Sequence, residues 1–105
     1  MLTMPDVARR LGDVKEKTTA ALRASEADRG ASVVLVAVVR EFDVKTDKAM
    51  RGATDDGSAR DSVIELEQAG DSAKAAAEAD PELGDAARDA VLAAHLAICI
   101  LKTEV

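Results

Sequence analysis

The stretch that decides the fold is residues 58–79, SARDSVIELEQAGDSAKAAAEA, followed by Asp80-Pro81-Glu82. Ser58, with Asp61 three residues later, is typical of a helix N-terminus. Asp80-Pro81-Glu82 has the residues of a second N-terminus, and Gly84-Asp85 is an alternative start. The apolar and small residues recur in steps of three and four, the spacing of one helix face; they are Ala59, Val63, Leu66, Gly70, Ala73 and Ala77. The sequence therefore predicts helices over residues 58–79 and 81–102.

The spacing of three and four between apolar or small residues continues in the second of these helices and appears again near the N-terminus. In residues 81–102 the seam, meaning the residues of the inward face, is Leu83, Ala87, Ala90, Ala94, Ala97 and Leu101. In residues 5–28 the seam is Met4, Val7, Leu11, Val14, Thr18, Ala21 and Ser25. Thr3 can cap this helix, Pro5 suits its first turn, and Gly30 follows its end.

Residues 32–51 allow two interpretations. Val33 to Val39 is rich in β-branched residues, which favour strands, and such a strand could pair with another chain. The helical spacing nevertheless continues through the whole segment; its seam is Ser32, Leu35, Val39, Phe42, Thr46 and Ala49. We therefore expect a helix here, with an intermolecular strand over residues 32–40 as the alternative.

Four helices joined by short connections predict one all-α domain over residues 1–105, an antiparallel up-down four-helix bundle. Hydrophobic residues make up 48% of the chain and aromatic residues 1%. Alanine supplies nearly half of that hydrophobic share. We therefore expect the core to gain stability from close approach of the helices rather than from bulky side chains.

Two stretches are apolar nearly all round, residues 31–39 and 90–101. A helix that is apolar on every side is usually buried on every side, whereas a single bundle covers one stripe of each helix. The leftover surface predicts self-association, most simply a homodimer, or a permanent protein partner. The expected interface residues are Val34, Val38, Val91, Leu92, Leu96, Ile98 and Leu101.

The net charge of −6 is unevenly distributed. Residues 1–52 carry 10 basic and 8 acidic groups, whereas residues 53–105 carry 4 basic and 12 acidic groups. Such a balance argues against binding to nucleic acid or to an anionic membrane. It predicts either a solvated surface or an acidic face for a protein partner, formed by Asp61, Glu65, Glu78, Glu82, Asp85 and Asp89.

The composition favours a non-enzymatic function: an adaptor, an inhibitor or immunity-type protein, or an assembly subunit. The chain has almost no aromatic residues, histidines, cysteines or glycine-rich loops, and catalytic and cofactor sites depend on such residues. We therefore expect no catalytic residues and no cofactor. A single cysteine and the absence of a signal-peptide pattern predict a cytoplasmic location.

One alternative is a metal-responsive regulator. His95 and Cys99 are one helical turn apart, a spacing that can hold two metal ligands. The segment His95-Leu96-Ala97-Ile98-Cys99 resembles the His-x-x-x-Cys part of the copper-sensing repressors of the CsoR type. Those are small, helical, oligomeric proteins, and the resemblance implies a copper site completed by a second cysteine, which this chain lacks.

The other alternative is a carrier protein. Asp61-Ser62-Val63 resembles the Asp-Ser-Leu of acyl carrier proteins, which are small, acidic four-helix bundles. The resemblance implies a phosphopantetheine group on Ser62, placed near a helix N-terminus. Arg60 stands where that family has glycine.

Overall fold

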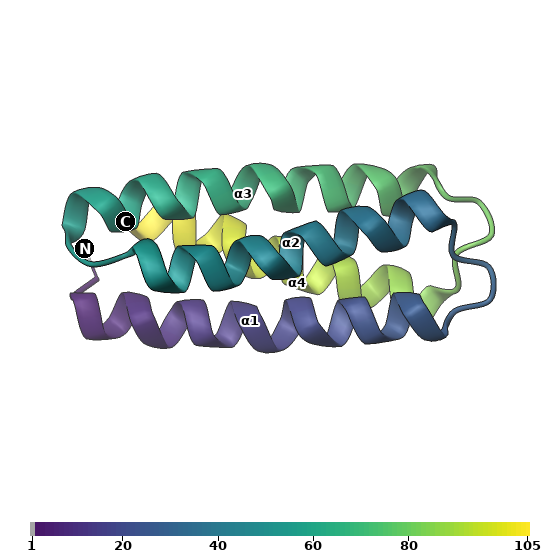
Figure 1. Ribbon diagram of the computed structural model, residues 1–105, viewed down its shortest axis with the longest axis horizontal. Helices are drawn as coiled ribbons and strands as arrows, with labels where there is room; N and C mark the ends of the chain where they lie inside the picture. Colours follow the sequence, from purple (N-terminus) through teal and green to yellow (C-terminus); the bar gives the residue numbers. More distant parts are fainter. Residues whose placement is uncertain (1) are drawn as a thin grey trace.

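The computed structural model describes residues 2–105 as four α-helices in one bundle (Figure 1). The helices are α1 (Met4–Ala27), α2 (Val33–Gly52), α3 (Asp56–Ala79) and α4 (Asp85–Glu104). Each packs against two neighbours: α1 and α3 both contact α2 and α4, so α2 and α4 lie across a diagonal. The molecule measures 41 × 20 × 17 Å, and successive helices run antiparallel. The predicted all-α, up-down four-helix bundle is confirmed.

Three of the four helix starts are fixed by side-chain caps. Thr3 and Asp6 form a capping box at α1, and the Ser32 hydroxyl accepts the Leu35 amide at 3.0 Å at α2. At α3 the cap is Asp55, which forms a reciprocal box with Ser58. The predicted box of Ser58 with Asp61 is therefore wrong, and the helix begins two residues earlier.

Helix α4 begins at Asp85, so the alternative start at Gly84-Asp85 is correct and the start at Pro81 is wrong. The reason lies in Asp80, which does not cap α4. Its carboxylate instead accepts the Ser32 amide at 2.9 Å and the Glu82 amide at 3.2 Å. Asp80 thus joins the two loops at one end of the bundle and holds residues 81–84 in a turn.

Residues 33–52 are helical throughout, and residues 2–105 contain no strand, so the alternative of an intermolecular strand is wrong for this structure. The β-branched run is accommodated because Leu35 and Val39 enter the core together with Phe42. Tertiary burial of this face outweighs the weak β-preference of the valines.

The predicted seams of α1, α2 and α3 are buried almost residue for residue. In α4 the prediction is wrong by one residue at two positions: Val91 and Ile98 are buried, whereas Ala90 and Ala97 are only half-buried. Compared with the prediction, α4 is rotated about its axis so that Val91 and Ile98 face the core, where they bury more apolar surface than alanines would.

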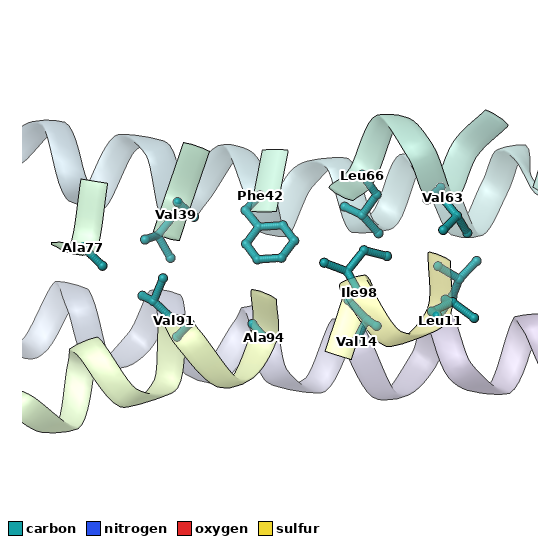
Figure 2. Packing of buried hydrophobic residues seen from close by; sticks show 14 of the residues in the cluster. Leu11, Val14, Val39, Phe42, Val63, Leu66, Ala77, Val91, Ala94 and Ile98 are labelled. Atoms are coloured by element: carbon teal, nitrogen blue, oxygen red, sulfur yellow. The ribbon is translucent and has the colours of Figure 1, made fainter. Parts of the chain in front are cut away.

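The centre of the core is built around Phe42, the one aromatic residue of the chain. Its ring from α2 and Ile98 from α4 point toward each other across the bundle (Figure 2). Gly70 on α3 makes room for both, because a Cβ at this position would lie 3.1 Å from the ring and 3.1 Å from Ile98 Cγ2. A glycine in the middle of α3 is therefore a packing requirement.

Candidate functional site

The outward side of α4 carries an apolar surface that nothing in the bundle covers. We call it the α4 outer face and define it as the exposed residues Ala93, Leu96 and Ile100, with half-buried Leu92 at its edge. Leu96 is 59% exposed and Ile100 43% exposed, and Ala93 is also exposed. Within residues 90–101 the only side chain that can carry a positive charge is His95, and no aspartate or glutamate occurs. Three turns of helix thus present hydrocarbon to solvent.

Three residues expected at an interface cannot contact a second chain while the bundle is folded. Val91, Ile98 and Leu101 are fully buried in the chain's own core. The prediction that these three residues lie in an interface is therefore wrong. Because residues 90–101 are apolar all round, the sequence does not show which side of the helix faces inward. Leu96 is exposed on the outward side, and Leu92 is half-buried.

Val34 and Val38 on α2 belong to a different surface. Val34 is 68% exposed, and both valines line a groove between α2 and α3. Lys45 and Glu65 lie at the same groove, which makes it partly charged. Because α2 is diagonal to α4, this groove does not join the α4 outer face. One copy therefore does not carry the two stretches as a single continuous patch.

The six acidic residues expected to form one face are also separated. Asp61 lies near the start of α3, and Glu78 lies 17 residues further on, about 25 Å along the helix. Glu65 is paired with Lys45 at 3.0 Å and Lys48 at 2.7 Å, which lowers its pKa and ties α2 to α3. Glu78, Glu82, Asp85 and Asp89 are all exposed and lie in or next to the connection between α3 and α4. A single acidic face is not present.

Ser62 is not at a helix N-terminus. It lies in the second turn of α3, half-buried beside α2. A Cβ on Gly52 would come within 3.1 Å of its hydroxyl oxygen, which shows how closely α2 approaches. A carrier serine at a helix start is therefore not what this chain presents.

His95 and Cys99 lie on the side of α4 that faces α3, and a third polar side chain joins them there. Asp71 Oδ1 from α3 is 2.8 Å from His95 Nε2, which is itself 3.3 Å from Cys99 Sγ. One ligand atom from each residue lies within 4.8 Å of the other two. The His95 side chain is 14% exposed and the Asp71 side chain 58% exposed, so the cluster is open to solvent on the α3 side.

The electrostatic surroundings of this cluster are acidic. Burial raises the pKa of the Cys99 thiol, and the Glu67 and Asp71 carboxylates raise it further, while Lys102 and Lys74 oppose them. Lys102 is held by Glu67 at 2.9 Å. The thiol is therefore protonated and unreactive at neutral pH unless a cation arrives to stabilise the thiolate.

Asp71 is the residue that the sequence analysis missed. The signal that could have found it is the register of the α3–α4 hairpin. A turn centred on residues 82–83 places residue 70 or 71 opposite His95 in an antiparallel pair. The observed approach of Gly70 to Ile98 and the contact of Glu67 with Lys102 agree with this register to within one helical turn.

Comparison with protein-family models, curated proteins and solved structures found no match to this chain. Among residues 2–105, no helix combines the length and the apolar character needed to cross a membrane.

Proposed function

We propose that this chain is a non-enzymatic interaction module that acts as a homodimer, with the α4 outer faces of two copies packed against each other. The observation that carries the proposal is the exposure of Leu96 and Ile100 in a stretch of α4 without acidic or strongly basic residues. A contiguous apolar stripe on a small domain is typical of a protein interface. Burial of this stripe against a second copy removes it from water.

Charge favours an antiparallel arrangement of the two α4 helices. Asp85, which pairs with Arg88 at 3.5 Å, and Asp89 lie at one end of the stripe, and Lys102, which pairs with Glu67, lies at the other end. An antiparallel pair brings the acidic end of each helix to the Lys102 end of the other. A parallel pair would place the acidic ends side by side, which like-charge repulsion disfavours. The helix dipoles favour the same antiparallel choice.

Small residues beside the stripe support close packing of two such helices. Ala93 and Ala97 flank Leu96 along α4, so the partner's leucine can settle between short side chains. Helices with small residues at the contact approach at the lower end of the usual range of about 8–10 Å. Ala97 is half-buried against the core, so the pair would extend the existing helix packing outward.

The test is the oligomeric state of the wild-type chain and of Leu96→Lys, measured by sedimentation equilibrium over a range of concentrations. Two-fold symmetry places each substitution twice in the interface, where it removes two buried leucines and adds two charges. We expect the dimer dissociation constant to rise by at least about 100-fold. Circular dichroism checks that the variant keeps its helices.

The matched control is Ala20→Lys, which adds the same charge on the outward side of α1, where Ala20 is exposed. We expect it to leave the dissociation constant unchanged. A wild-type chain that stays monomeric at high concentration would overturn the homodimer. A dimer that Leu96→Lys leaves intact would instead overturn the choice of face.

A further inference from the structure

The structure assigns a second feature to α4: we propose that Asp71, His95 and Cys99 form a zinc site that joins α3 to α4 within one chain. The site is independent of the proposed dimer, because all three ligands come from the same bundle. His95 and Cys99 extend from successive turns of α4, and Asp71 reaches them from the antiparallel neighbour.

The distances are those of a site that needs little movement to accept the ion. Zinc bonds of about 2.0–2.3 Å in tetrahedral geometry place two ligand atoms about 3.3–3.6 Å apart. The observed separations are 2.8 Å from Asp71 Oδ1 to His95 Nε2 and 3.3 Å from His95 Nε2 to Cys99 Sγ. The ion therefore requires these two contacts to widen by less than about 1 Å, while the ligand atoms of Asp71 and Cys99, which lie within 4.8 Å of each other, settle at the same tetrahedral spacing.

The donor set selects zinc among common metal ions. A carboxylate, an imidazole and a thiolate suit a borderline cation, whereas magnesium and calcium prefer oxygen ligands alone. Copper(I) prefers sulfur, and this chain offers one cysteine. Three protein ligands leave the fourth tetrahedral position for water, and the exposed side of Asp71 gives that water a path to solvent.

The surroundings favour a cation and explain how the ligands are held without one. Glu67 and Asp71 make the local potential negative, and Lys102 is already engaged with Glu67. Zinc binding releases the proton of Cys99, shifts the proton of neutral His95 from Nε2 to Nδ1, and replaces the contact between His95 Nε2 and Asp71 with one bond from each residue to the ion. The bound ion then ties α3 to α4 at the edge of the α4 outer face.

The test is calorimetric titration of the reduced chain with zinc chloride. We expect one zinc ion per chain, and we expect Asp71→Asn, His95→Gln and Cys99→Ser each to weaken binding by at least about tenfold. Asp61→Asn is the matched control, because Asp61 is an exposed aspartate on the same helix as Asp71, and it leaves binding unchanged. Thermal unfolding with and without zinc shows that each variant folds and that the ion raises the Tm of the wild type.

Cobalt(II) provides a second readout that a merely structural cluster would not give. Tetrahedral cobalt with one thiolate has an intense charge-transfer absorption, which Cys99→Ser abolishes and Asp71→Asn shifts. Absence of stoichiometric zinc binding would overturn the proposal. Binding that the three ligand variants leave unchanged would overturn it as well, since the ion would then lie elsewhere on the acidic surface.

Discussion

Helices α1 and α4 are neighbours that bury comparable inner faces. Their outer faces differ, because the outer face of α1 is charged and that of α4 is largely apolar. The outward positions of α1 hold Arg9, Glu16 and Arg23, all exposed and charged. The equivalent positions on α4, at the same seven-residue spacing, hold Asp89, Leu96 and Thr103, with the apolar residues between them. The fold needs one apolar stripe from each helix. The second stripe on α4 is not covered by the bundle itself, and this is the physical basis of the proposed interface.

The largest effect is expected at the inner faces, where the two helices should behave alike. Leu11→Ala in α1 and Ile98→Ala in α4 each remove a fully buried side chain. We expect each to lower the free energy of unfolding by about 2–5 kcal/mol, from lost burial and the cavity left behind. Urea denaturation of dilute, monomeric protein measures this.

The comparison is sharpened by a third variant, Leu96→Ala, on the outer face of the same helix. In monomeric protein it should change the free energy of unfolding by no more than about 0.5 kcal/mol. An equal loss from Leu96→Ala and Ile98→Ala would mean that the outer face already contributes to the fold of a single chain.

Substitutions at Gly12 on α1 and at Gly70 on α3 should change the stability of the fold in opposite directions. Gly70→Val pushes a branched side chain into Phe42 and Ile98, and we expect it to destabilise the bundle by about 1–3 kcal/mol. Gly12, in the middle of α1, has nothing within 4 Å of the position of a Cβ. Gly12→Ala should therefore stabilise the fold by about 0.5–1 kcal/mol through helix propensity alone. Thermal unfolding ranks the two variants, and a destabilising Gly12→Ala would contradict the packing described for α1.

The same contrast explains what the sequence could predict. In α1 and α3 charged residues surround the seam, so the three–four spacing can point in only one direction, and the predicted residues are the buried ones. Residues 90–101 have no charged residues around the seam. The predicted seam therefore includes Ala90 and Ala97, whereas Val91 and Ile98 are the buried residues. Periodicity identifies an inner face only when the outer face is polar.

The candidate sites could likewise be predicted only in part, where the spacing of residues along one helix was enough to identify them. His95 and Cys99 can be found from the sequence because they are one turn apart on one helix, which spacing shows directly. Asp71 requires the register between two helices, and that depends on where the turn at residues 80–84 ends. The expected acidic face is wrong because the net charge of a half-chain does not say where along a 24-residue helix each carboxylate lies.

A modest, pH-dependent effect is expected at the polar flank that α1 shares with α2. Asp43 accepts hydrogen bonds from Lys15 at 2.9 Å, Thr18 at 2.8 Å and Thr19 at 3.0 Å. Burial alone would raise the pKa of Asp43, but these three donors outweigh it and lower the pKa below the ordinary value of 3.8. The ionised carboxylate is therefore favoured in the folded chain. The resulting stability is present above the ordinary aspartate pKa and is lost as the pH falls through the lower, folded pKa.

Asp43→Asn should accordingly lower the free energy of unfolding by about 1 kcal/mol at pH 7. It should also flatten the fall in stability below about pH 4, because one carboxylate with a lowered pKa is gone. The control is Glu26→Gln, which breaks the exposed pair of Glu26 with Arg40 between the same two helices. Solvent screens that pair, so the change should be no more than about 0.5 kcal/mol. Urea unfolding from about pH 3 to pH 7 separates the two, and equal pH profiles for both variants would show that α1 gains nothing from the buried flank beyond what surface charge provides.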